Sequence, residues 1–506
     1  MPTRYTLHLL VFVFLLLSFW HMPHLVTANG DSPLKGDARR APVRPTLAAA
    51  GNDPRPGPDQ PSAFLAGRVA VRAIFLESNG GAEPSTEDWQ PGQIDTARQR
   101  IAAALDWWQA RLPNARLTFD LIATVVPSRY EPIAHDLSGE GLWIGDALSQ
   151  LGYSGNSYFD QAYAADEALR RERGADWATT IFVANSAADG DGRFADGMFA
   201  YAYISGPFLV LTSDAGPYGA GQISPVLAHE LGHIFGALDQ YASAATPCDL
   251  QSGYLSVPTT NSQANNCGIR FVCIMLDPAS AYPNGRIDES ALGQVGYRDS
   301  DGDNLPDPLD TAPAMRISLV QEPKNGRPIV SGQAFDQPYP AATPLTINTI
   351  ARVEYRVDGG DWMALPAGDR AYDSAVETIA STLPLYDGQH NLELRAINSV
   401  GAASPIFKQS VVVAGVGAQP AYAADAPELV NSAAITLTLG APASAETQIS
   451  ENPFFEAATW KAATERASFN LTPTDGQHTI YVRFRDQNGL ESPAIVRRVL
   501  LDRVAP

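Results

Sequence analysis

Cysteine is scarce in this sequence. Only three of the 506 residues are cysteines, and Cys248, Cys267 and Cys273 all lie within one short stretch. A fold held together mainly by disulfides needs a larger set, so stability must come from hydrophobic cores. The hydrophobic content of 45% is sufficient for such cores. Three cysteines allow one disulfide and leave one thiol, and the sequence does not say which two pair.

Basic residues are also in the minority. Lysine and arginine together number 35 against 55 acidic residues, which gives a formal net charge of −20. A nucleic-acid-binding protein needs a basic surface, so this class is excluded. An acidic chain is typical of a soluble extracellular protein, and its carboxylates suit divalent cations.

Long apolar runs are absent after the first thirty residues. The run at 7–20 is too short to cross a membrane comfortably, and small residues at Val26 and Ala28 follow it. We expect residues 1–28 to be a secretory signal, with an uncleaved anchor as the alternative. The expected location is therefore secreted or extracellular, with no stable membrane span after signal cleavage.

The next two segments differ in composition and in hydrophobic pattern. Residues 29–64 are rich in proline, glycine, alanine and arginine, which is typical of a linker or pro-segment. Residues 65–298 mix strand and helix patterns, so we expect an α/β (α+β) domain in which helices pack on a sheet. The expected strands are 67–76, 116–126, 177–185, 198–204 and 208–212, with 198–204 at the edge, and the expected helices are 93–112 and 158–172.

After residue 312 the helical periodicity ends and short alternating segments are separated by turns. This pattern predicts two all-β sandwich modules, Ig-like or fibronectin-like, at 313–416 and 417–506. An internal repeat supports two copies, since 387–405 and 475–493 share eight of nineteen residues. We expect a structural role for His390 and His478, which occupy the same repeat position.

The strongest motif is HELGHIFGALD at 229–239. We expect Ser224 to cap its helix. His229 and His233 are one helical turn apart, so both imidazoles can bind one metal ion. Glu230 can act as the general base on a metal-bound water.

The end of the motif offers a third ligand. Gly236 can end the helix in a left-handed conformation and turn the chain, so that Asp239 faces the metal. Two nitrogens and one oxygen, with one position open for water, suit Zn²⁺. Glu289 on a later helix is the alternative third ligand, although no known motif surrounds it.

These residues resemble the metzincin clan of zinc metalloproteases, in the variant with aspartate in the last ligand position that is found in snapalysins. The segment CIML at 273–276 is similar to the methionine turn of the reprolysins, with Met275 beneath the metal. The resemblance covers roughly residues 65–297. It implies zinc, a peptide substrate along the strand near 198–204, and a water nucleophile. No cysteine precedes the motif, so a thiol latch from the pro-segment is excluded.

A second cation site is expected at 299–312, between the catalytic and sandwich regions. The carboxylates and one backbone carbonyl fall at the spacing of a calcium loop and resemble thrombospondin type 3 and dockerin-like loops. The expected ligands are Asp299, Asp301, Asp303, the carbonyl of Leu305, Asp307 and Asp310.

The sequence therefore predicts a secreted zinc endopeptidase that hydrolyses peptide bonds in a protein or peptide substrate. The β-sandwich modules are expected to bind a cell surface, a glycan or the substrate. The alternative is a catalytically inactive or weakly active adhesion protein that uses these modules on a surface or glycoprotein. The intact Glu230 and ligand set favour the enzyme.

Overall fold

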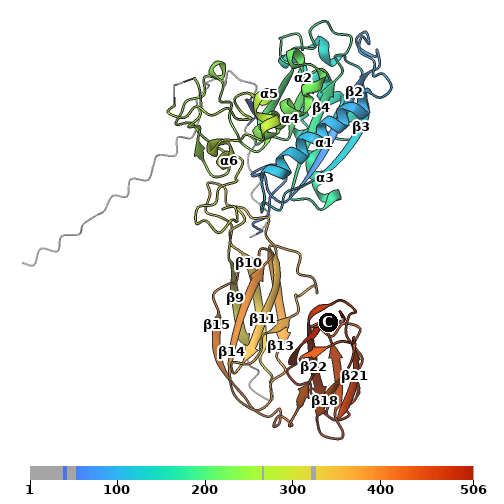
Figure 1. Ribbon diagram of the computed structural model, residues 1–506, viewed down its shortest axis with the longest axis vertical. Coiled ribbons are helices and arrows are strands. Elements are labelled where there is room, and N and C mark those ends of the chain that lie inside the picture. The colour runs from blue at the N-terminus through green and yellow to red at the C-terminus, as the bar shows by residue number, and fades with distance from the viewer. Residues whose placement is uncertain (1–37, 43–52, 265–266, 321–325, 505–506) are drawn as a thin grey trace, which may run out of the picture.

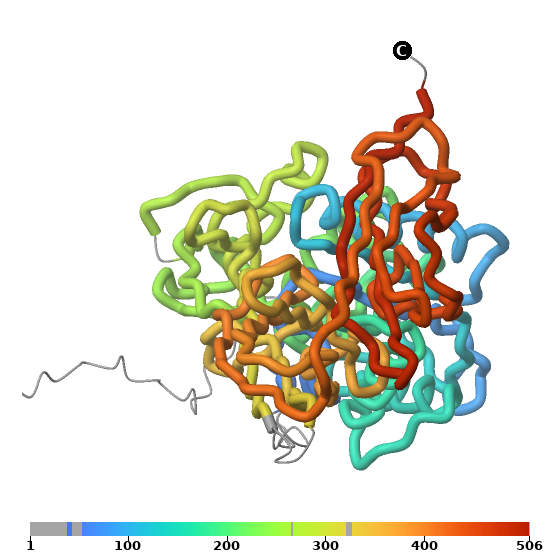
Figure 2. The backbone as a smooth tube through the Cα atoms, turned by 90° about the horizontal axis from the view of Figure 1, so that it is seen from below, coloured from blue at the N-terminus to red at the C-terminus, as the bar shows by residue number. Residues whose placement is uncertain are grey.

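The computed structural model describes residues 38–42, 53–264, 267–320 and 326–504 (Figure 1). The expected signal at 1–28 lies outside these residues, as does most of the expected pro-segment before residue 53. An α/β unit forms one end of the molecule, and two β-sandwiches follow it. Figure 2, seen from below, shows the two sandwiches side by side in front of the α/β unit.

A six-stranded sheet forms the centre of the α/β unit. Its strand order is β1-β5-β6-β4-β2-β3; β1 and β5 are parallel to each other and run antiparallel to the other four strands. The central strands are buried on both faces, as expected for a sheet covered by helices. The strands are β1 (Ala38–Arg40), β2 (Arg68–Ser78), β3 (Thr118–Ser128), β4 (Trp177–Ala184), β5 (Ala200–Ile204) and β6 (Phe208–Thr212).

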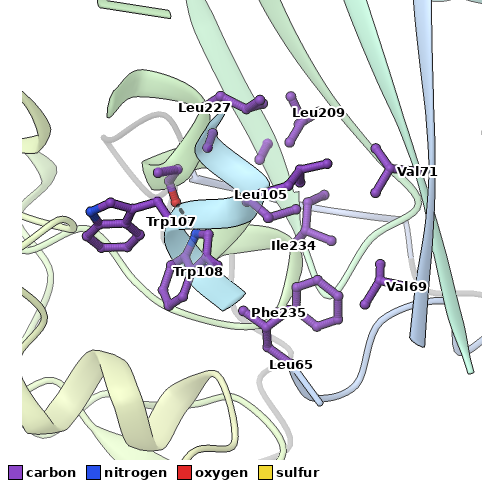
Figure 3. Packing of buried hydrophobic residues seen from close by; sticks show 14 of the residues in the cluster. Leu65, Val69, Val71, Leu105, Trp107, Trp108, Leu209, Leu227, Ile234 and Phe235 are labelled. Carbon is purple, nitrogen blue, oxygen red and sulfur yellow. Dashed lines mark hydrogen bonds between the residues drawn. The ribbon is translucent and has the colours of Figure 1, made fainter. Parts of the chain in front are cut away.

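Helices cover both faces of this sheet. One face packs against α1 (Gln93–Arg111) and α4 (Ile223–Ile234), and Figure 3 shows Leu227 and Ile234 of α4 close to the sheet residues Leu209 and Val71. The other face packs against α2 (Glu140–Gln150) and α3 (Tyr158–Arg173). The short helices α5 (Pro278–Ala281) and α6 (Glu289–Gln294) follow α4 in the chain.

Three details differ from the sequence-based expectation. Strand β5 is not the sheet edge, because the short strand β1 pairs with it on the outside. Helix α2 lies in a segment for which no helix was expected. Ser224 does not cap α4, since the helix begins at Ile223 and the Ser224 hydroxyl donates to the Arg100 carbonyl at 2.9 Å.

The remaining strands form two β-sandwiches, each of two sheets facing a buried core. The first contains β9 (Pro313–Val320), β10 (Ile329–Asp336), β11 (Ile350–Val357), β12 (Met363–Leu365), β13 (Val376–Thr382), β14 (Gly388–Asn398) and β15 (Phe407–Val413). The second contains β16 (Ala423–Asp425), β17 (Leu429–Val430), β18 (Ala434–Gly440), β19 (Glu446–Ser450), β20 (Lys461–Ala462), β21 (Arg466–Asn470), β22 (Gly476–Arg485) and β23 (Ile495–Leu501). A small hairpin of β7 (Gln251–Ser252) and β8 (Val257–Pro258) belongs to the α/β unit.

The two repeat histidines make equivalent contacts. His390 lies between the Asp358 carboxylate at 2.8 Å and the Tyr386 carbonyl at 3.1 Å. His478 lies between the Glu451 carboxylate at 2.5 Å and a backbone carbonyl at 2.8 Å. Each imidazole thus joins neighbouring segments of its sandwich.

No helix among the described residues is long and apolar enough to cross a membrane.

Candidate metal centre and cleft

Three side chains of the HELGHIFGALD segment meet at one point. The His229 Nε2 atom lies 3.1 Å from Asp239 Oδ1 and 3.1 Å from His233 Nε2, and His233 Nε2 lies 3.2 Å from Asp239 Oδ1. All three residues are almost fully buried. Helix α4 supplies both histidines, and the turn after it supplies the aspartate.

The triangle of ligand atoms has the size that zinc requires. Zinc bonds of about 2.0–2.1 Å at tetrahedral angles place neighbouring ligand atoms roughly 3.3 Å apart. The observed separations of 3.1–3.2 Å approach this value. Two imidazole nitrogens and a carboxylate oxygen are also donors that zinc accepts, so the residues fit the ion.

Backbone carbonyls fix the tautomer of both histidines. His229 Nδ1 donates to the Ile274 carbonyl at 2.8 Å, and His233 Nδ1 donates to the Ala237 carbonyl at 2.7 Å. Because a carbonyl can only accept, the proton of each neutral ring lies on Nδ1. The Nε2 lone pairs are therefore directed at the common point, an arrangement typical of metal-binding histidines.

Two glycines make the backbone turn and the close packing around the site possible. Gly236 has φ +96°, and the chain turns there so that Asp239 reaches the histidines. A Cβ atom on Gly232 would lie only 2.7 Å from the Met275 sulfur. The fully buried Met275 can thus approach α4 directly between the two histidines.

A buried polar network supports the turn after Asp239. The Gln240 backbone N–H donates to the Met275 carbonyl at 2.9 Å, and its side-chain amide donates to Asp288 at 2.9 Å. The Gln240 side-chain oxygen accepts from Asn261 at 2.7 Å and from the Cys273 thiol at 2.8 Å. Sequence reasoning missed Gln240, Asn261 and Asp288, because the contacts that join them link positions 21 and 48 residues apart.

The three cysteines serve two roles. Cys248 and Cys267 form a disulfide, while Cys273 is a buried thiol. Burial, with the nearby Asp288 carboxylate, raises the pKa of Cys273, so it remains protonated and donates to Gln240. The third cysteine therefore belongs to the support of the site.

The other candidate residues lie as follows. Glu230 is buried beside His229 on α4. Glu289 is exposed at the start of α6 and does not join the cluster of His229, His233 and Asp239. Met275, the residue of the predicted Met-turn, is fully buried against Gly232 of α4.

The acidic loop brings together only some of its expected ligands. Carboxylate oxygens of Asp299, Asp301 and Asp303 lie within 4.8 Å of one another and are exposed. Asp307 is instead buried and accepts from Arg298 at 2.7 Å. Burial and the carboxylates of its loop neighbours raise the pKa of Asp310, which reflects the concentration of negative charge there.

The N-terminal strand β1 lies beside the candidate metal centre. Ala38 pairs with Ala202 of β5, and its backbone N–H donates to Asp239 Oδ2 at 3.2 Å. The outer edge of β5 and the aspartate of the triangle are thus both contacted by the same short segment of chain.

No family model and no curated protein matches this sequence. Among solved structures, the chain is similar to the central fibronectin-III array of RIM-binding protein, at 15% identity over 40% of this chain and 73% of that one, with a TM-score of 0.15. It is also similar to fibronectin(III)-like modules of CbhA from Clostridium thermocellum, at 15% identity over 37% of this chain and 94% of that one, with a TM-score of 0.13. TM-scores of this size carry no argument about fold or function.

Proposed function

We propose that this chain is a secreted zinc-dependent endopeptidase that hydrolyses peptide bonds. The observation that carries the proposal is the buried triangle of His229 Nε2, His233 Nε2 and Asp239 Oδ1, with edges of 3.1–3.2 Å. The Cys248–Cys267 disulfide supports an oxidising, extracellular location.

The protein groups have distinct parts in this reaction. A zinc ion held by the triangle would supply Lewis acidity, which lowers the pKa of water and polarises a carbonyl oxygen. Glu230 accepts the proton of the attacking water and then donates it to the leaving amine. The carbonyls of Ile274 and Ala237 keep both imidazoles oriented.

The substrate lies along the outer edge of β5 in this proposal. Once β1 leaves this edge, the freed N–H and C=O groups of β5 can pair with an extended peptide, which gives main-chain binding without sequence preference. The support is β1, which makes a parallel pairing with Ala202–Ile204 of β5 and also reaches Asp239. A peptide bound there would pass the ligand triangle.

We also propose that Asp299, Asp301 and Asp303 bind Ca²⁺. Their oxygens converge within 4.8 Å in an exposed loop, and Asp299 also accepts the backbone N–H of Gly302 at 2.7 Å and of Asn304 at 2.8 Å. These bonds give the loop its shape, and oxygen ligands of this kind suit calcium.

The enzymatic proposal is tested with the purified full chain and a peptide library, with and without a zinc chelator, beside Glu230→Ala. We expect the wild type to cut peptides, the chelator to abolish cleavage, and the variant to lose about 100-fold or more in rate, as expected for a lost general base. Zinc content should be unchanged in Glu230→Ala. Cleavage that survives either the chelator or the substitution contradicts the proposal, and a zinc-loaded wild type that cuts nothing favours the adhesion alternative.

A further inference from the structure

A buried carboxylate beside β5 receives three tyrosine hydroxyls. Glu140, at the start of α2, accepts from Tyr158 and Tyr201 at 2.6 Å each and from Tyr203 through a very short hydrogen bond. Glu140 is only 2% exposed. Tyr201 and Tyr203 belong to β5, so this carboxylate lies directly behind the strand along which a substrate is proposed to bind.

Three hydroxyl donors suit an ionised Glu140 carboxylate, but none of them carries a positive charge that would balance it. An ionised carboxylate only accepts hydrogen bonds and has about four acceptor positions, of which the tyrosines use three. Tyrosine hydroxyls carry no formal charge, and a buried negative charge is costly without a cation nearby. Glu140 therefore favours a cationic group that enters from the outer edge of β5, where β1 lies in the structure.

Arg39 is in position to be that group. It pairs with Tyr203 across the parallel β1–β5 ladder, and paired residues direct their side chains to the same face of a sheet. Its Nε atom is buried and has no hydrogen-bond partner within the described structure. Burial raises the pKa of Glu140, while the tyrosine hydroxyls and the positive charge of Arg39 oppose this rise, which places the guanidinium within electrostatic reach.

We propose that Glu140, Tyr201 and Tyr203 form a subsite for a cationic side chain, arginine or lysine, of the peptide that binds along β5, and that Arg39 occupies this subsite in the structure. The subsite deepens the proposed endopeptidase function and rests on it for its biological meaning. Helix α4, which carries both histidines, packs on the other face of β5. The subsite therefore determines which peptide binds and takes no part in the chemical step.

The neighbouring arginine provides a matched control. Arg40 pairs with Ile204, is exposed, and alternates to the other face of β1. Arg39→Ala and Arg40→Ala remove the same charge from the same strand, but only the first empties the subsite. If β1 and a substrate compete for β5, Arg39→Ala should increase the cleavage rate of a library on the order of tenfold, whereas Arg40→Ala should not.

The decisive experiment measures binding, so that it does not depend on cleavage. Two acetylated and amidated fluorescent pentapeptides, Ala-Ala-Arg-Ala-Ala and its citrulline analogue, are titrated into the Arg39→Ala/Glu230→Ala chain. Citrulline keeps the shape of arginine without its charge. We expect the arginine peptide to bind on the order of tenfold more tightly, as for a partly solvated charge pair. Adding Glu140→Gln should remove this preference, and adding Asp166→Asn, a buried carboxylate that bonds Thr180 instead, should preserve it.

The possible results separate the two proposals. Equal binding of the arginine and citrulline peptides overturns the subsite even if Glu140→Gln fails to fold, because that comparison needs no change at Glu140. Cleavage by Arg39→Ala, in which the subsite is empty, without any basic preference also overturns the subsite but leaves the endopeptidase intact. An arginine preference in binding, together with no cleavage by the wild type, supports the subsite and contradicts the endopeptidase.

Discussion

Gly232 shows how closely single residues determine this site. It lies on α4 between the two histidines, where any side chain would meet the sulfur of Met275. The sequence alone predicted that His229, His233 and Asp239 lie together, as they do in the structure, because all three belong to eleven consecutive residues. It could not identify Gln240 and Asp288 as a pair, since their contact joins positions 48 residues apart.

The residue-scale prediction is that Gly232→Ala disturbs the metal centre. The new methyl group must displace Met275, and such overpacking costs about 1–3 kcal/mol. We expect this loss in the free energy of unfolding, measured by denaturant titration, together with a lower zinc content after dialysis. Gly221→Ala is the control, because its Cβ would meet nothing within 4 Å. Wild-type stability and zinc content in Gly232→Ala would show that Met275 does not pack as described.

At the scale of elements, the sequence predicted those helices and strands whose apolar residues recur at regular spacing and missed those without such a pattern. Helix α1 was expected at 93–112 and is present as Gln93–Arg111, since its apolar positions recur at helical spacing. Strand β1 could not be foreseen, because Ala-Arg-Arg has no strand signal and its conformation depends on pairing with β5. The covered edge of β5 follows from the same long-range contact.

The element-scale prediction concerns His478 on β22. The Thr474 carbonyl and the Glu451 carboxylate raise the pKa of His478 above its usual value near 6.5. A raised folded-state pKa means that the stabilisation is fully present below pH 6.5 and is lost as pH rises through the folded pKa. We therefore expect the wild type to lose stability relative to His478→Gln between pH 6 and pH 9, as measured by thermal unfolding. Parallel curves for the two proteins would refute this role.

At the scale of the whole molecule, the α/β unit and the first sandwich share packed contacts. Leu345 of the sandwich is 2% exposed and belongs to the core of the α/β unit, and the Tyr254 hydroxyl donates to its carbonyl at 3.1 Å. The acidic loop of Asp299–Asp303 precedes this sandwich in the chain. A cation bound in the loop would therefore stabilise a connection between two units that already pack against each other.

The whole-molecule prediction is that Ca²⁺ stabilises this joint. With dissociation constants of about 10⁻⁴–10⁻³ M, typical of extracellular calcium sites, 1 mM Ca²⁺ should add about 0.4–1.4 kcal/mol to the free energy of unfolding. Asp301→Asn should lose this gain, whereas Asp425→Asn, an exposed aspartate of the second sandwich, should keep it. Identical unfolding curves with and without Ca²⁺ would argue against the site.

The measurement that most directly tests the account is the zinc content of the purified protein by elemental analysis. The triangle of His229, His233 and Asp239 predicts one zinc ion per chain in the wild type and a large loss in Asp239→Ala, with full retention in Glu289→Ala. A wild type without zinc, or an Asp239→Ala variant that keeps its full zinc content, would contradict the proposed metal centre.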